Sequence, residues 1–213
     1  MRKQVLNIFT VLALGLAVVG CKKGTEAETT DAKEVVEVEV EAKYKAIPEK
    51  SMIIWKANKI VGGHSGTINV SNGVAKTKGN QLVGGSFIFD IATLKNTDIE
   101  DAVQKGKLEG HLKADDFFDV EKHPNASFEI TSVENGKISG NLMMKGIKKN
   151  VTVPVTVGMT GDMMTITSDV FTIDRTEWNI KYNSGKFADP AKLGDYMIKD
   201  DVELKISITA KKA

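Results

Sequence analysis

The sequence predicts an all-β domain of antiparallel strands, either a closed barrel or a sandwich, for residues 51–213. Segments in which apolar and polar residues alternate recur along this region, and about eight or nine of them are long enough to be strands. The dipeptides Asn72-Gly73 and Asn135-Gly136 are strong signals for tight hairpin turns. Short connections of this kind favour antiparallel neighbours. The one clear helix signal is the capping box formed by Thr97 and Glu100.

Residues 1–20 are predicted to be a signal peptide. Arg2 and Lys3 form a basic start, and the apolar run 8–19 that follows is too short to span a bilayer. The run ends in Val-Val-Gly-Cys, which resembles the lipobox of bacterial lipoproteins, with cleavage before Cys21. Cys21 is the only cysteine of the chain, and acylation gives this unpaired thiol a use. Two or more acyl chains would hold the mature protein on a membrane. The alternative is an ordinary signal peptide followed by an incidental cysteine.

Residues 21–50 are expected to be a lipidated cysteine and a flexible linker. This stretch is rich in Glu, Lys, Thr and Ala and offers little apolar surface to offset chain entropy. Val36, Val38 and Val40 alternate with glutamates, so an edge strand at this point is the alternative. The interpretation of the stretch as a linker predicts a spacer that holds the folded domain away from the lipid surface.

From Ser51 onwards the expected elements follow one another closely. Strands are predicted at residues 52–61, 64–71, 74–78, 81–94, 126–134, 137–145, 150–158, 163–173 and 201–210. The helix is expected to run from Thr97 to about residue 107. Gly84-Gly85 lies within a long strand and indicates a bend or bulge. Pro154 cannot donate a ladder hydrogen bond, so it is expected at an edge or a bulge.

The stretch 111–130, HLKADDFFDVEKHPNASFEI, changes character twice. Asp115 can cap a short turn, Phe117 and Phe118 require burial, and His123-Pro124 stops any helix before a strand begins. The His-Leu start, the Asp-Asp-Phe-Phe-Asp-Val run and the Pro-x-Ala-x-Phe exit together resemble the signature of the YceI-like family. That resemblance implies a bacterial extracytoplasmic protein whose lipocalin-like barrel binds a polyisoprenoid or another long-chain lipid.

Further pieces of the same resemblance lie along residues 51–213. Gly140-Asn141-Leu142, with Gly146 and Val151, resembles a hairpin of the family; the Phe-Thr-Ile-Asp-Arg run at 171–175 resembles the end of one of its strands, and 201–204 its final strand. The sequence departs from the family pattern at 176–179, where Thr-Glu-Trp-Asn replaces Ser-Asp-Phe-Gly. The resemblance therefore implies an eight-stranded, antiparallel, lipocalin-like barrel with one or two short helices.

Composition and motifs argue against several function classes. The net charge of +1 gives no reason to expect a nucleic-acid partner. The chain lacks a Gly-x-Ser-x-Gly elbow, a phosphate-binding glycine loop and a His-Glu-x-x-His motif. Asp90, Asp174 and Glu177 are interpreted as members of ion pairs at the barrel rim rather than as a catalytic pair. We therefore expect a protein that is not an enzyme and carries no cofactor.

The histidines suggest a second hypothesis. The spacing of His64, His111 and His123 matches no metal-ligand pattern, so we expect no metal site and expect each imidazole to form local hydrogen bonds. A barrel can nevertheless bring His64 and His111 together at one mouth, which keeps a metal- or haem-binding envelope protein as an alternative. A third hypothesis is a barrel with a filled core that acts only through its outer surface, as an interaction module.

The apolar face of each strand predicts the interior of the barrel. The residues expected to line the lumen and contact a ligand are Val83, Gly85, Phe87, Phe89, Ile91, Phe128, Ile130, Leu142, Met144, Val153, Val155 and Phe171. Arg175 has two interpretations: an ion pair with Asp200 or Asp201 at the rim, or a contact to the polar head of a lipid.

These observations lead to one functional hypothesis. The chain is expected to be a non-catalytic extracytoplasmic protein that holds a long-chain apolar ligand in its barrel. The candidate ligands are a polyisoprenoid, a quinone-like molecule and a fatty-acid derivative. Its other expected partner is the membrane of the bacterial cell envelope, through Cys21, and a homodimer is left open.

Overall fold

The computed structural model describes residues 25–213. The predicted signal peptide, the lipobox and Cys21 lie outside these residues. The strands are β1 (Thr25–Glu26), β2 (Glu28–Asp31), β3 (Ala42–Ala46), β4 (Met52–Lys59), β5 (Gly63–Lys78), β6 (Gln81–Asn96), β7 (Asn125–Glu134), β8 (Lys137–Met144), β9 (Ile147–Pro154), β10 (Thr156–Thr160), β11 (Met163–Thr167), β12 (Phe171–Asp174) and β13 (Ile198–Lys212). The helices are η1 (Pro48–Lys50), α1 (Ala102–Lys113), η2 (Arg175–Trp178), α2 (Pro190–Leu193) and η3 (Gly194–Tyr196).

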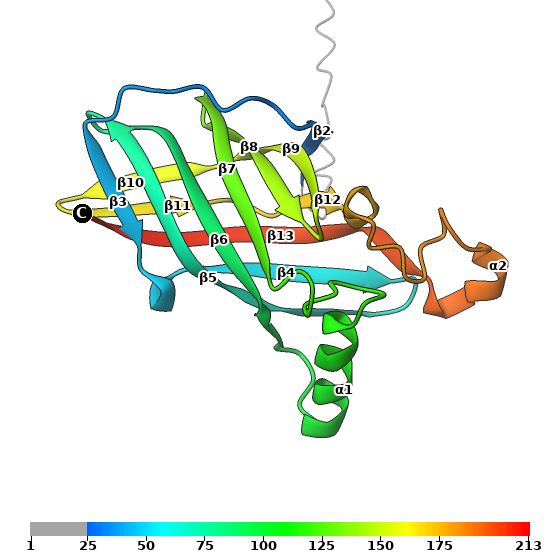
Figure 1. Cartoon of the computed structure of the whole chain (residues 1–213). Helices are drawn as coiled ribbons and strands as arrows, with labels where there is room; N and C mark the ends of the chain where they lie inside the picture. The colour runs from blue at the N-terminus through cyan, green and yellow to red at the C-terminus, as the bar shows by residue number, and fades with distance from the viewer. Residues whose placement is uncertain (1–24) are drawn as a thin grey trace, which may run out of the picture.

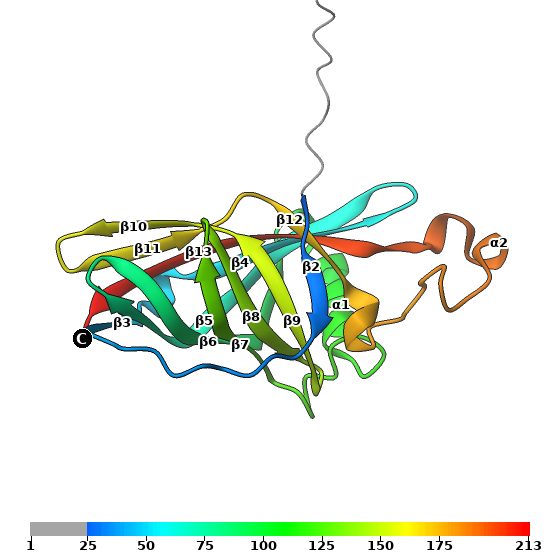
Figure 2. The ribbon, with the colours of Figure 1, turned by 90° about the horizontal axis from the view of Figure 1, so that it is seen from above.

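The strands form a barrel (Figures 1 and 2). β4 to β9 pair in chain order as antiparallel neighbours, and β13 pairs with β4 on the other side. β10 continues β9 but pairs with β11, which in turn pairs with β13 and closes the ring. Counted in this way, the barrel has eight strands: β3–β4, β5, β6, β7, β8, β9–β10, β11–β12 and β13. The predicted fold class is confirmed.

Pro154 marks the point at which the long β9–β10 strand changes partners. It is the last residue of β9 and lies opposite Lys137 of β8, whereas Thr156 already lies opposite Thr167 of β11. Because proline has no N–H to donate, the ladder is interrupted where the strand must bend from one neighbour to the next. The structure thus places Pro154 at an irregularity, as expected.

One of the two hairpin predictions is confirmed and the other is wrong. Asn135-Gly136 joins β7 to β8 with φ of 51° and 73°, values that a type I′ turn requires. Asn72-Gly73 instead lies inside β5, opposite Ile88 and Phe87 of β6. A Cβ at Gly73 would lie 2.3 Å from the ring of Phe87, so the glycine makes room for an aromatic ring.

The helix prediction needs correction at both ends. Helix α1 begins at Ala102 rather than Thr97, and it ends at Lys113 rather than near residue 107. Its N-cap is Asp101, whose side chain accepts a hydrogen bond of 2.8 Å from the backbone N–H of Gln104. Thr97 and Glu100 form no capping box. The Asp98 carboxylate between them accepts hydrogen bonds from the backbone N–H of Ser65 and from the Asn96 amide, and these bonds tie this segment to the barrel. Phe117 is buried beyond the helix, as its sequence context predicts.

The folded unit begins well before Ser51. Residues 25–50 were predicted to be a flexible linker, but β2 pairs with β9, and β3 pairs with β5 and β13. Tyr44 of β3 is only 4% exposed. Val36 and Val38 are exposed and form no strand. The linker prediction is therefore wrong for these strands, because backbone hydrogen bonds to neighbouring strands hold both of them and the burial of Tyr44 further stabilises β3.

The interior of the barrel divides into two apolar clusters. One contains Trp55, Phe171 and Trp178 and lies towards α1 and η2. The other contains Val70, Met164 and Ala210, which are fully buried, and it lies towards the C-terminus.

Candidate ligand-binding cavity

A cavity of about 350 Å³ occupies the barrel interior, a volume at the lower end of the range typical of small-molecule sites. Its wall is almost wholly apolar. The polar and charged side chains on the wall are few: Lys59, His64, His111, Arg175, Tyr182, Asn183 and Tyr196. They come from the end of β4, the start of β5, α1, η2 and the segment between η2 and β13, which gather at the end of the barrel that carries α1 and α2 (Figure 1). The site is thus an apolar chamber with a polar mouth.

The structure brings most of the predicted lumen residues to this wall. Ten of them line the cavity: Phe87, Phe89, Ile91, Phe128, Ile130, Leu142, Met144, Val153, Val155 and Phe171. They belong to β6, β7, β8, β9, the β9–β10 link and β12. Strand periodicity therefore predicted the inward face correctly for these elements.

Val83 and Gly85 do not line the cavity. Between the pairs Lys76↔Gly84 and Thr77↔Leu82 the β5–β6 register shifts, so Val83 is the extra residue of a bulge. The shift reverses the inward parity, and Leu82 is buried in place of Val83. Gly85 has φ +149°, and a Cβ there would lie 2.4 Å from the carbonyl oxygen of Val74. Gly85 therefore allows the backbone of β6 to approach that of β5 closely.

Several wall residues were not predicted. They include Ile53, Trp55 and Ala57 of β4 and Val202, Leu204, Ile206 and Ile208 of β13. Both sets follow strict alternation, so the periodicity used for the other strands was sufficient to find them. Leu108, Leu112 and Phe117 also line the cavity, and nothing local in the sequence indicates that α1 and the following turn cover its mouth.

Trp55 is the one tryptophan on the cavity wall. Its indole lies over Gly66 of the neighbouring strand, where a Cβ would approach the ring to 2.6 Å. Its Nε1 is buried and has no hydrogen-bond partner among residues 25–213. By contrast, Nε1 of Trp178 donates a 3.1 Å hydrogen bond to the carbonyl of Leu142. Trp55 is therefore both an unpaired donor within the apolar chamber and a natural fluorescent reporter of its contents.

The two histidines at the mouth each pair with a carboxylate. Nδ1 of His64 lies 3.0 Å from Asp98, and Nε2 of His111 lies 2.9 Å from Asp116. Burial acts to raise the pKa of Asp98, but hydrogen bonds from Ser65, His64 and Asn96 outweigh it and hold that pKa below its usual value. Within residues 25–213 no three His, Cys, Asp or Glu side chains are grouped so that they could hold a metal ion.

Aromatic rings surround His111. Its imidazole packs edge-on against Tyr182, with ring centroids 4.6 Å apart, and against Phe117 at 5.2 Å. Tyr182 and Phe117 also contact each other. The ring cluster joins α1, the turn that follows it and the segment after η2, and so fixes the position of one side of the mouth.

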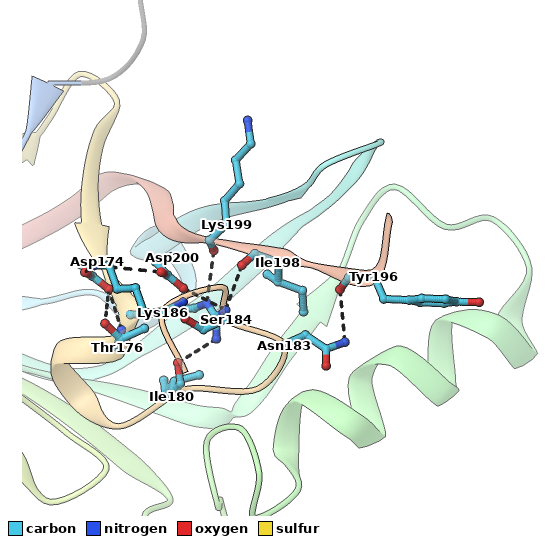
Figure 3. A network of polar contacts seen from close by, with 11 residues as sticks. Asp174, Thr176, Ile180, Asn183, Ser184, Lys186, Tyr196, Ile198, Lys199 and Asp200 are labelled. Carbon is cyan, nitrogen blue, oxygen red and sulfur yellow. Dashed lines mark hydrogen bonds and ion pairs between the residues drawn. The ribbon is translucent and has the colours of Figure 1, made fainter. Parts of the chain in front are cut away.

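Arg175 lies on the cavity wall at the start of η2, and its guanidinium forms hydrogen bonds with other groups of the protein. Its guanidinium is 4% exposed and donates to the carbonyls of Ile180 at 2.7 Å, Ile198 at 3.1 Å and Lys199 at 3.2 Å. It also pairs with Asp200 at 3.3 Å. Figure 3 shows these carbonyls converging on one point. Burial lowers the pKa of Arg175, and the charges of Asp200 and Asp174 oppose that shift. The geometry favours the rim ion pair over a head-group contact.

Residues 176–179, where the sequence departs from the family pattern, form most of η2 and its C-cap. Asn179 caps η2 with φ +58° and ψ +26°, a left-handed conformation that glycine favours and asparagine tolerates. Trp178 is fully buried in the core cluster. Next to it, Asp174 accepts hydrogen bonds from Thr176 and forms an ion pair with Lys186. Burial acts to raise the pKa of Asp174, but these partners hold it below its usual value.

No helix within residues 25–213 combines the length and apolar character needed to cross a bilayer.

Comparison with solved structures supports the barrel. Burkholderia cenocepacia BcnA superimposes with a TM-score of 0.61 at 22% identity, covering 78% of this chain and 99% of that one. A domain from Saccharophagus degradans superimposes with a TM-score of 0.58 at 11% identity, covering 81% and 100%. At these identities the likeness shows the fold alone.

Sequence comparison identifies the family. A UPF0312 protein of Pseudomonas aeruginosa is 33% identical over 90 residues, which are 37% of this chain and 47% of that protein, so the chain spans about half the length of these relatives. A UPF0312 protein of Staphylococcus aureus is 30% identical over 148 residues, which are 63% of this chain and 84% of that protein. The sequence profile described as "YceI-like domain" matches residues 44–210. This match takes in every barrel strand from Tyr44 onwards, and the chain belongs to the YceI-like family.

Proposed function

We propose that this protein binds a single long-chain apolar lipid inside its barrel and does not alter it chemically. The observation that carries the proposal is the cavity of about 350 Å³, whose wall is apolar along the barrel interior and polar only at the mouth. Such a chamber suits a ligand with one slender hydrocarbon chain and a small polar end. A polyisoprenoid, a quinone-like molecule and a fatty-acid derivative all share this chemistry.

Two further observations support the proposal. The Saccharophagus degradans structure that shares the fold is described as a polyisoprenoid-binding domain. Three ionisable groups on the cavity wall are also engaged with protein partners: His64 and His111 with carboxylates, and Arg175 with three carbonyls and Asp200. These contacts are typical of groups that hold structure, which fits binding better than catalysis.

The direct test is chemical identification of the bound molecule. We expect an organic extract of protein purified from its native envelope to contain a long-chain lipid in near-stoichiometric amount, seen by mass spectrometry. Titration of the delipidated protein with that lipid is expected to change the emission of Trp55, which lies on the wall. A protein that yields no lipid and whose emission does not respond to long-chain probes would instead be a filled-core interaction module.

We also propose that the protein is a lipoprotein on the extracytoplasmic side of the bacterial envelope, anchored through Cys21. Cys21→Ser removes the only thiol of the chain, so we expect the variant to lose incorporation of labelled palmitate and membrane attachment. Ser127→Ala, in the folded barrel, is the control and should be labelled like the parent. Equal labelling of the Cys21→Ser chain would contradict the anchor.

A further inference from the structure

The barrel has a seam between β9 and β12. β9 pairs with β8 on one side, and β12 pairs with β13 on its far side; in residues 25–213 no ladder joins β9 directly to β12. The two strands are separated because the pairing that closes the ring, β10 with β11, lies beyond the bend at Pro154. Towards the mouth, the wall of the barrel is therefore open to a further strand.

The chain's own residues 25–31, here called the seam strand, occupy this gap. Its β1 part runs parallel to β12, with Thr25 opposite Phe171, and the Ala27 N–H donates a 2.9 Å hydrogen bond to the Thr172 carbonyl. Its β2 part runs antiparallel to β9, with Glu28 opposite Thr152. Figure 2 shows β2 alongside β9. The seam strand thus bridges two barrel strands that do not pair with each other.

The seam strand covers the barrel wall beside the cavity, although none of its own residues lines the cavity. Val151 and Val153 of β9 and Phe171 and Ile173 of β12 line the cavity on either side of the seam. Ala27 is 6% exposed and belongs to the same apolar cluster as these four residues. With the seam strand removed, the flanks of the gap would be apolar and would lead directly into the chamber.

Apart from its backbone ladders, few contacts hold the seam strand. Ala27 is its only buried residue, and the other six are polar and at least partly exposed. A salt bridge of 3.3 Å joins Asp31 to Lys149. Just beyond, the Asn141 amide forms two hydrogen bonds with the backbone of Lys33, of 2.9 and 2.6 Å. Because segments with little buried apolar surface open more readily than core strands, the seam strand is expected to detach while the barrel stays folded.

We propose that the seam strand is a detachable cover over a lateral entrance, through which a long-chain lipid passes between the bilayer and the cavity. This inference rests on the proposed lipid-binding function. Only four peptide steps separate Cys21 from Thr25, so an acylated Cys21 would lie within about 14 Å of the seam even along a fully extended chain. The apolar flanks of the seam then face the membrane, and a lipid can reach the chamber without its chain crossing bulk water.

A disulfide across the seam tests this proposal. Glu28 and Thr152 lie opposite each other, both at outward-facing positions, and the Cα spacing of such a pair suits a disulfide. The full acylated chain carrying Glu28→Cys and Thr152→Cys is reconstituted in vesicles, and uptake of the fluorescent polyene parinaric acid is followed. We expect oxidation to slow uptake and release by at least ~10-fold without changing the equilibrium affinity, and reduction to restore both rates.

The matched control places the same bond in a closed ladder. Thr165 of β11 and Thr209 of β13 also lie opposite each other on the outer face, so Thr165→Cys with Thr209→Cys should leave the rates unchanged whether oxidised or reduced. A second variant acts in the opposite direction: Ala27→Asp places a carboxylate at the buried position of the seam strand and should speed exchange several-fold. Glu28→Ala, at an exposed position, should not.

The outcomes separate the two proposals. If the locked protein exchanges the probe as fast as the reduced one, the lateral entrance is wrong, and the ligand uses the mouth near His64 and His111. If the parent protein and the Thr165–Thr209 control take up neither the probe nor lipid extracted from the envelope, the lipid-binding function itself fails, and the entrance fails with it. Slower exchange only in the oxidised seam variant supports the entrance.

Discussion

Val153→Trp is expected to empty the cavity. Val153 is buried on β9, faces the chamber and lies opposite Ile138 of β8, so an indole at this position would occupy the space of the ligand chain. We expect lipid content and probe affinity to fall by at least about tenfold, equivalent to ~1.4 kcal/mol of binding free energy. The measurements are mass spectrometry of extracts and titration with parinaric acid.

The control for Val153→Trp lies on the same strand and the opposite face. Lys148 is exposed and lies opposite the exposed Met143, so Lys148→Trp should leave lipid content unchanged. Val153→Trp should still fold, with an overpacking cost of about 1–3 kcal/mol at most, because the cavity offers room for the ring. Should Lys148→Trp lose the lipid while Val153→Trp keeps it, the inward face assigned to β9 would be wrong.

Arg175→Leu is expected to destabilise the fold strongly. The substitution leaves the carbonyls of Ile180, Ile198 and Lys199 and the carboxylate of Asp200 without the guanidinium that they share. Removing one partner of a buried ion pair typically costs about 3–5 kcal/mol. The free energy of unfolding, measured in urea, should fall by that order, because the segment between η2 and β13 loses its attachment to the barrel.

A neighbouring ion pair supplies the comparison for Arg175→Leu. Lys186 pairs with Asp174 in the same network (Figure 3), but its side chain is 57% exposed. Lys186→Met should therefore cost no more than about 1 kcal/mol. If Arg175→Leu kept the parent's stability and lost only its lipid, Arg175 would be the head-group contact that the sequence left open as the alternative.

The sequence alone was enough to predict the class of fold and most of the inward face. Alternating apolar residues, hairpin turns and the motifs of 111–130, 140–151 and 171–175 led to an eight-stranded barrel of the YceI-like family, and both conclusions are confirmed. The same alternation placed Phe87, Phe128 and Val153 on the cavity wall. This prediction succeeds because the side chains of a strand alternate between two faces, so a strand with one buried face has apolar residues at every second position.

The tertiary structure decided features that no local pattern carries. The bulge at Val83 reverses the parity of β6, because register depends on how β5 and β6 pair rather than on β6 itself. Gly73 follows a turn-like Asn and yet packs under Phe87 in mid-strand. Residues 25–31 join the barrel although six of the seven are polar, because unpaired backbone groups at the seam accept them. Hydrogen bonding between distant backbones leaves no periodic trace in a sequence.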